Sequence, residues 1–250
     1  MFTNILVVTL TFLSCALTAV ALLPSYPTRV IAGVTVIDTP IVRSAIDFAR
    51  SHMDDDIFNH CMRAWVLGAL MISKNSILRE VVDVEVHAVG IILHDLGWDR
   101  RPNSDTVSKD RRFEVDGAIA AREFIRRHED GKKWEERRVQ LVWDSIALHA
   151  ERKIAYFKEE EVQAVSKSSA LDIGGADFGI TQTEYALIAK EFKKDGLRAA
   201  LNSSIVWLCQ TKPASTMDNW MMAWGERYVA NYSTAAGPRR IDGIFSNLRS

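Results

Sequence analysis

The sequence has little charge imbalance and few cysteines. Its 250 residues include 31 lysines and arginines and 32 aspartates and glutamates, a formal net charge of -1. A near-neutral surface does not attract polyanions, so we expect no nucleic acid partner and no binding to an anionic membrane surface. The three cysteines are Cys15, Cys61 and Cys209, of which the last two either form one disulfide or remain two buried thiols.

Charged residues are also absent from Ile5 to Leu23. This apolar run ends in the small residues Ala19-Val20-Ala21, a pattern typical of a signal peptide and its cleavage site. We therefore predict that residues 1–23 are a signal peptide and that the mature protein is secreted, with no membrane contact after cleavage. The alternative is a membrane anchor formed by residues 5–23, because about 18 or more apolar residues can cross a bilayer. A third reading, a helix packed on the domain, is disfavoured because the run has no polar face.

Several motifs of known chemistry are missing. The chain has no Gly-x-Ser-x-Gly elbow, no glycine-rich phosphate loop and no His-Glu-x-x-His helix. Sustained alternation of polar and apolar residues is missing as well, which argues against a sheet. No repeat of fixed period and no low-complexity linker divides the chain. The sequence therefore predicts an all-α protein with a single helical domain over residues 24–250.

Apolar residues three and four positions apart indicate where the helices lie. Asp38-Thr39-Pro40 predicts a helix start, because proline is favoured in the first turn. Before it, residues 25–37 mix proline, glycine and β-branched residues and predict an extended lead-in. The segments predicted as later helices are 57–73, 83–96, 113–127, 135–150, 159–167, 183–194, 197–209 and 217–232.

His94 and Asp95 are adjacent within the predicted helix over residues 83–96, which is nearly all apolar. Burying a carboxylate without a partner costs roughly several kcal/mol. A divalent cation would neutralise this carboxylate and would use both the imidazole nitrogen and the carboxylate oxygen as ligands. The pair therefore predicts a metal site where the helix faces a cleft.

The order of three motifs resembles a known family. Asn59-His60, then Leu93-His94-Asp95-Leu96-Gly97, then a distant aspartate are similar to the HD superfamily of metal-dependent hydrolases. Phe58-Asn59-His60-Cys61-Met62-Arg63 with Gly68, and Phe113-Glu114-Val115-Asp116-Gly117-Ala118, look like the branch that contains fungal and yeast cyanamide hydratases. The resemblance covers about residues 40–185 and implies an HD-type helical bundle.

The resemblance also implies a set of metal ligands. His60, His94 and Asp95 would bind one divalent ion together with a later aspartate. Asp177 and Asp172 both fit an aspartate followed closely by glycine, and we prefer Asp177, with Asp172 as the alternative. Imidazole and carboxylate ligands suit zinc, iron or manganese, and we favour zinc.

Three further residues have expected roles near this ion. Glu114 is either an acid that favours its helix dipole or a group that assists the metal-activated water, as a partner or a proton acceptor. His149 either caps a helix, contacts substrate or completes a second metal position. Arg63 follows His60 by three residues and so shares its helix face, where we expect it to pair with a carboxylate and to contact substrate.

These residues predict a metal-dependent hydrolase of a small-molecule substrate, a phosphoester or a related compound. The ion would lower the pKa of water toward about 7. Asp95 would orient that water, and Glu114 or His149 would take its proton. The alternative is a hydro-lyase similar to cyanamide hydratase, acting on a small nitrile-type molecule. A second alternative is a secreted, non-catalytic protein with the HD fold, and the formation of a homo-oligomer is left open.

Overall fold

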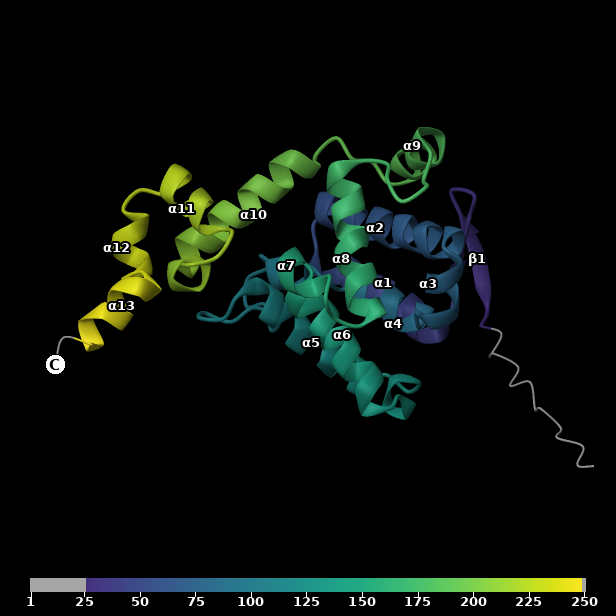
Figure 1. The fold of residues 1–250 in the computed structure, drawn as a ribbon, viewed down its shortest axis with the longest axis horizontal. Helices are drawn as coiled ribbons and strands as arrows, with labels where there is room; N and C mark the ends of the chain where they lie inside the picture. The colour runs from purple at the N-terminus through teal and green to yellow at the C-terminus, as the bar shows by residue number, and fades with distance from the viewer. Residues whose placement is uncertain (1–25, 249–250) are drawn as a thin grey trace, which may run out of the picture.

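A computed structural model describes residues 26–248, and helices make up most of it (Figure 1). The prediction of a helical domain is confirmed, with one short hairpin in addition. The strands are β1 (Thr28–Ile31) and β2 (Val34–Ile37). The helices are α1 (Pro40–His52), α2 (Asp55–Lys74), α3 (Ser76–Val81), α4 (Val84–Ile92), α5 (Phe113–Arg127), α6 (Glu136–Leu148), α7 (Arg152–Ala155), α8 (Glu160–Gly174), α9 (Gln182–Glu191), α10 (Leu197–Thr211), α11 (Met222–Tyr228), α12 (Tyr232–Ala236) and α13 (Arg240–Asn247). Short 3₁₀ helices are η1 (Leu96–Trp98), η2 (Gly131–Lys133) and η3 (Pro213–Thr216).

The predicted extended lead-in forms a β-hairpin. β1 and β2 pair antiparallel, with Ile31 opposite Val34. The two residues between them, Ala32 and Gly33, have φ angles of 49° and 82°. A type I′ hairpin turn requires positive φ at both central positions, and these two residues meet that condition. The prediction of an all-α fold is therefore wrong for this hairpin. Each strand has only four residues, which is too few to show a clear alternation of polar and apolar residues.

α2, α4, α6 and α8 form the centre of the fold. α8 packs against α2, α4 and α6, and it crosses in front of α2 in Figure 1. Eight of the residues of α4 are buried, from Glu85 to Ile92, as its apolar sequence predicts. Burying a Val, Leu or Ile side chain contributes about 1.5–3 kcal/mol. The helix that leads to His94 is therefore held firmly by its neighbours.

α4 ends at Ile92, earlier than predicted. Leu93 has φ −100° and ψ 3°, which is not helical, and His94 and Asp95 lie in a turn before η1. The expectation that the pair lies inside a helix is therefore wrong. On a helix, neighbouring side chains point about 100° apart, whereas a turn can direct two consecutive side chains toward one point.

The C-terminal helices form a second hydrophobic cluster. α10, η3, α11 and α12 pack on one another. Buried side chains of this cluster include Leu208, Met221 and Tyr232, and Ile57 and Phe113 from the main body belong to it as well. In Figure 1, α11, α12 and α13 lie at one end of the molecule and β1 lies at the other.

The predicted signal peptide or anchor, residues 1–23, lies outside the described residues, and so does Cys15. Within residues 26–248, none of the helices has the length and apolar character needed to cross a bilayer. Cys61 and Cys209 are both buried and free, so the structure has two thiols rather than a disulfide.

Candidate metal centre

Three of the predicted ligands lie together between α2 and the turn that follows α4. His60 comes from the first half of α2, and His94 and Asp95 come from the turn. All three are buried, with at most 1% of their surface exposed. Nε2 of His94 is 3.3 Å from Oδ2 of Asp95, and Nε2 of His60 is 3.7 Å from the same oxygen. One ligand atom from each residue lies within 4.8 Å of the other two, which is a spacing that one ion can bridge.

The hydrogen bonds of the two histidines direct Nε2 toward Asp95. Nδ1 of His94 donates to the carbonyl oxygen of Ile91 at 2.7 Å, and Nδ1 of His60 donates to Oδ2 of Asp172 at 2.6 Å. Burial, with the neighbouring His60 as the next cause, lowers the pKa of His94 to about 3. His94 is therefore neutral at pH 7. A neutral ring that donates from Nδ1 presents a lone pair at Nε2, which is the form that binds a metal.

The unsatisfied atoms of this cluster fit a cation. Nε2 of His94 and both carboxylate oxygens of Asp95 are buried without a hydrogen-bond partner among the described residues. Leaving a buried polar atom unsatisfied costs about 1–3 kcal/mol. Burial also raises the pKa of Asp95, because the charged carboxylate is removed from water. Two imidazoles and one carboxylate suit a first-row divalent ion, so the residues present fit a metal.

His149 faces the same carboxylate from the end of α6. Its Nε2 lies 3.8 Å from Oδ1 of Asp95, and its Nδ1 donates to the carbonyl oxygen of Ile146 at 2.8 Å. Its ring packs edge-on against that of His94, with 4.7 Å between the ring centroids. Burial lowers the pKa of His149 to about 4, with the neighbouring His94 as the next cause. The structure therefore brings a third imidazole to Asp95.

The two candidates for a fourth ligand lie in different environments. Asp177 is exposed in the loop after α8, where its Oδ1 accepts a hydrogen bond from the backbone nitrogen of Phe178 at 2.7 Å. Asp172 is fully buried on α8 and contacts His60. Our preference for Asp177 is therefore not supported, because the chain leaves α8 before residue 177 and carries that side chain to the surface.

Asp172 is connected to the metal cluster by its hydrogen bond with His60. Besides the hydrogen bond from His60, its carboxylate accepts bonds from Nε and Nη2 of Arg63, at 2.7 and 2.9 Å. Burial alone would raise the pKa of Asp172, but the bonds from His60 and Arg63 outweigh it and lower the pKa to about 2. Asp172 is therefore an anion at neutral pH that fixes the orientation of the His60 ring.

Arg63 is not placed to contact a substrate. Its side chain is fully buried, and its Nη1 donates to the carbonyl oxygens of Phe192 and Lys193 at 3.1 and 2.6 Å. The rest of the guanidinium binds Asp172. The expected pairing with a carboxylate is present, but the expected substrate contact is not, because these bonds occupy the donors of the guanidinium.

Glu114 is buried beside the site in a chain of polar contacts. Its Oε2 accepts a hydrogen bond from Nε of Arg112, and its Oε1 accepts one from Nε1 of Trp220, both at 3.2 Å. Arg112 also donates to Glu151 at 2.7 Å. Both carboxylate oxygens are thus engaged, so the structure favours a positioning role for Glu114 over that of a proton acceptor.

Gly97 lets α5 approach the metal-binding turn. A Cβ atom at this position would lie 2.0 Å from the carbonyl oxygen of Phe113, the first residue of α5. No side chain fits in that space. Because Gly97 has no side chain, the start of α5 can pack directly against the turn that carries His94 and Asp95.

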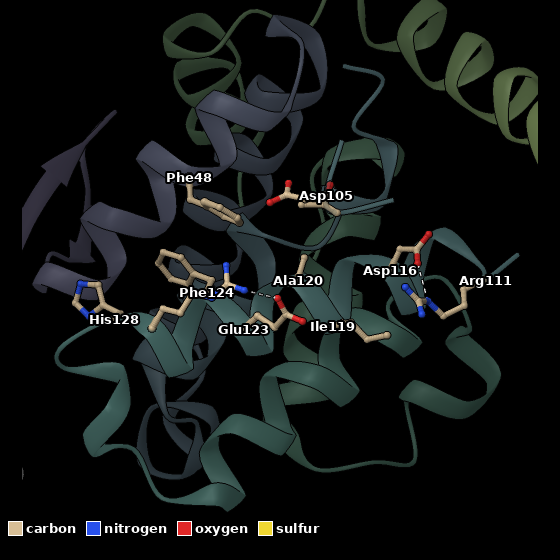
Figure 2. A pocket seen from close by; sticks show the side chains of 11 residues that line it. Phe48, Asp105, Arg111, Asp116, Ile119, Ala120, Glu123, Phe124 and His128 are labelled. Atoms are coloured by element: carbon tan, nitrogen blue, oxygen red, sulfur yellow. Dashed lines mark hydrogen bonds and ion pairs between the residues drawn. The ribbon is translucent and has the colours of Figure 1, made fainter. Parts of the chain in front are cut away.

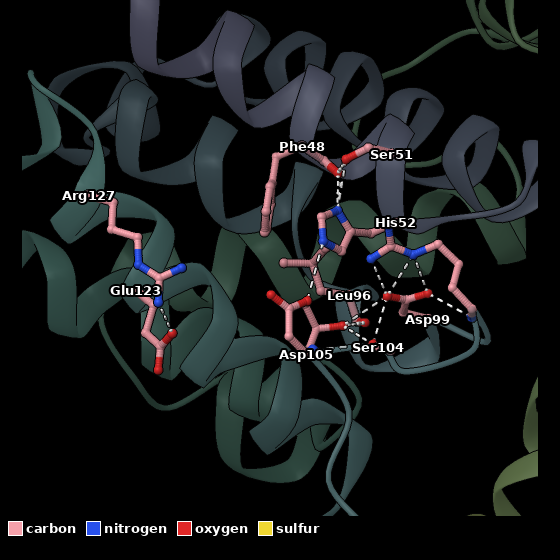
Figure 3. A network of polar contacts seen from close by, with 11 residues as sticks. Phe48, Ser51, His52, Leu96, Asp99, Ser104, Asp105, Glu123 and Arg127 are labelled. Atoms are coloured by element: carbon pink, nitrogen blue, oxygen red, sulfur yellow. Dashed lines mark hydrogen bonds and ion pairs between the residues drawn. The ribbon is translucent and has the colours of Figure 1, made fainter.

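The loop after Trp98 is held by a polar network around Asp99 (Figure 3). The buried carboxylate of Asp99 accepts hydrogen bonds from Nε and Nη2 of Arg101, at 2.9 and 2.7 Å, and from Oγ of Ser104, at 2.7 Å. Charge-assisted bonds of this kind are the strong ones, and they fix the backbone on both sides of Asp99. The network therefore positions Trp98, which lines the cavity next to the metal cluster.

The metal cluster opens into a cavity of about 590 Å³. His60, His94, Asp95 and His149 line it, together with apolar and aromatic side chains. The sequence did not indicate this second group, which consists mainly of Trp98, Phe113, Ile173, Leu201, Ile205, Trp220 and Trp224. The tryptophans near the C-terminus were visible in the sequence, but nothing there connected them to the metal motifs.

A second, smaller pocket of about 260 Å³ lies between α1 and α5 (Figure 2). Four of its charged side chains form two ion pairs with one another. Nε of Arg111 donates to Asp116 at 2.9 Å, and Nη2 of Arg127 donates to Glu123 at 2.8 Å. Because these groups satisfy each other, we place the chemistry in the cavity beside the metal cluster.

Comparison with known families agrees with this geometry. Residues 57–199 match the model of the HD domain, and this segment is more than half of the 250 residues. It contains the three clustered residues, His60, His94 and Asp95. No curated protein showed significant similarity to the chain, so the resemblance to cyanamide hydratases stays a prediction. The chain belongs to the HD domain family, whose members are generally metal-dependent hydrolases.

Proposed function

We propose that this HD protein is a metal-dependent hydrolase of small organic phosphoesters. One observation carries the proposal. His60, His94 and Asp95 are buried side chains that converge on one point in the wall of a cavity, and His94 and Asp95 have metal-binding atoms without a hydrogen-bond partner in the described part of the chain. Buried atoms of this kind are costly unless a ligand satisfies them.

The residues around the ion have separate roles in the proposed reaction. His60, His94 and Asp95 would hold a divalent ion, and that ion would supply the Lewis acidity that lowers the pKa of water toward about 7. Asp172 keeps the His60 ring in place through its 2.6 Å hydrogen bond. His149 is a neutral base whose Nε2 lies near Oδ1 of Asp95, the carboxylate oxygen that His60 and His94 do not approach. In this proposal, Nε2 of His149 accepts the proton of the attacking water.

The cavity supports an organic phosphoester over a nitrile. Ligand pockets for organic molecules typically measure about 300–1,000 Å³, and this cavity measures about 590 Å³. A molecule the size of cyanamide would leave most of that volume unfilled. Two exposed cationic side chains, Arg152 and Lys153, line the same cavity, and phosphate groups bind to Arg and Lys donors.

The test is a paired assay on the metal-loaded full chain. Zinc-, manganese- and iron-loaded protein is given p-nitrophenyl phosphate, its diester and cyanamide in parallel. We expect phosphoester turnover, a loss of at least about 100-fold in His94→Ala, and no loss in His128→Ala, a matched histidine outside the cluster. Turnover of cyanamide alone would replace the proposal with the hydratase alternative. Turnover of neither compound by folded, metal-loaded protein would leave the non-catalytic alternative.

We also propose that the protein is secreted, on the strength of the uncharged run from Ile5 to Leu23. The run is long enough for either a signal peptide or an anchor. The intact mass of the protein recovered from a secreting host separates the two. Cleavage near residue 23 supports secretion, and full-length protein in the membrane fraction contradicts it.

A further inference from the structure

One part of the cavity wall comes from outside the matched HD segment. That segment ends at residue 199. Leu201, Ile205, Trp220 and Trp224 lie beyond it, yet they line the same cavity as the metal cluster. The family segment therefore provides the metal-binding atoms, and the C-terminal helices provide much of the apolar surface that a substrate would meet.

We infer that Trp220 and Trp224 determine substrate specificity by selecting phosphoesters whose organic group is a flat ring. The inference rests on the proposed function, because it names the part of the substrate that the metal cluster does not bind. Aromatic side chains give large, flat contact surfaces, and they favour planar partners through stacked or edge-to-face contacts.

Trp220 is fixed relative to the HD motifs. Its indole N–H donates to Oε1 of Glu114 at 3.2 Å, and Glu114 is held in turn by Arg112. The Trp220 ring also packs edge-on against Phe113, with 6.3 Å between the ring centroids. The indole is therefore held on two sides by residues at the start of α5, close to the metal-binding turn.

Trp224 extends this aromatic surface. Its ring is nearly perpendicular to that of Trp220, at 84°, with 6.1 Å between the centroids. Its indole N–H donates to Oδ1 of Asn202 at 3.2 Å. Because both indole N–H groups already have partners in the protein, the two tryptophans offer the cavity ring surface rather than hydrogen-bond donors. Such a surface recognises the shape and apolar character of a substrate.

The test compares two ligands that differ only in the ring. Phenylphosphonate and methylphosphonate are titrated calorimetrically into the zinc-loaded full chain, since neither is hydrolysed. Stacking on an aromatic side chain is worth about 1–3 kcal/mol, so we expect phenylphosphonate to bind about tenfold more tightly. In Trp220→Ala and in Trp224→Ala we expect this ratio to fall toward one, with the zinc content and the methylphosphonate affinity little changed.

Trp207→Ala is the matched control. Trp207 lies on α10 in the same C-terminal cluster, but it does not line the cavity. We expect this variant to keep the phenyl preference. Circular dichroism monitors folding, and Trp220→Phe and Trp224→Leu replace any alanine variant that unfolds. Trp220→Phe keeps a flat ring and should retain most of the preference, whereas Trp224→Leu should lower it.

The outcomes separate the inference from the proposed function. Equal affinity for the two phosphonates in the unmodified protein would overturn the inference and leave the proposed function standing. A phenyl preference that survives in folded Trp220→Ala, Trp224→Ala or Trp224→Leu would overturn the assignment to these residues. Binding of neither phosphonate to the zinc-loaded protein would overturn the proposed function, and the inference with it.

Discussion

Asp172→Asn tests the link between the buried ion pair and the metal centre. The substitution keeps the size of the side chain and removes its charge. Arg63 then loses the carboxylate that binds its Nε and Nη2 atoms, and His60 loses the anion that orients its ring. We therefore expect two effects, a lower stability of the metal-free protein and a weaker affinity for metal.

The structure sets the size of both effects. Removing one partner of a buried ion pair costs about 3–5 kcal/mol, because the other charge is left uncompensated. The fall in the pKa of Asp172 from 3.8 to about 2 corresponds to about 2 kcal/mol of favourable interaction with the charged form. We expect the free energy of unfolding to fall by about 2–5 kcal/mol. Loss of a group that orients a ligand typically weakens metal affinity by about 10- to 100-fold.

Urea denaturation of the metal-free protein and zinc titration against a competing chelator measure the two quantities. Asp177→Asn is the control, since it makes the same chemical change at an exposed aspartate and should alter stability by less than about 0.5 kcal/mol. A loss of less than about 1 kcal/mol in Asp172→Asn, with unchanged zinc affinity, would refute the reasoning. Complete loss of zinc binding would instead make Asp172 a direct ligand.

Three other predictions follow from the same geometry. Gly97→Ala should lower stability by about 1–3 kcal/mol or more, because its Cβ would overlap the carbonyl oxygen of Phe113; an unchanged melting temperature would contradict this close approach. Because the pKa of Asp172 is lowered on folding, its charged form stabilises the protein above about pH 4, and this stabilisation is lost as the pH falls toward 2. In urea titrations, the stability difference between the unmodified protein and Asp172→Asn should therefore shrink over that range. A constant difference would contradict this prediction. His149→Ala should retain zinc and lower kcat by about 10²- to 10⁴-fold; loss of zinc together with activity would show that His149 is a ligand instead.

The main helices could be predicted from the sequence because their apolar spacing is strong. The segment predicted at 113–127 coincides with α5, and the one at 57–73 differs from α2 by a few residues. The end of α4 could not be predicted in this way, because Leu93 and Leu96 continue the apolar pattern. The helix ends at Ile92, and the turn that follows brings Gly97 against Phe113. This contact between distant segments has no local signal.

The metal ligands were predictable to the extent that they lie in ordered motifs. His60, His94 and Asp95 could be proposed together from the resemblance, and the structure brings them together. The choice between Asp172 and Asp177 depended on where α8 ends, and sequence patterns locate helix ends poorly. The aromatic side of the cavity, formed by Trp98, Phe113, Trp220 and Trp224, was not predictable. It forms only when the C-terminal helices pack beside the metal-binding turn.

The central claim is that His94 and Asp95 bind a metal ion, and the metal content of the purified full chain tests it most directly. The protein is stripped with a chelator, reloaded with zinc, desalted and analysed by mass spectrometry for bound metal. We predict about one ion per chain in the unmodified protein and in His128→Ala, and almost none in the double variant His94→Ala with Asp95→Ala. Unchanged metal content in a folded double variant would contradict the claim.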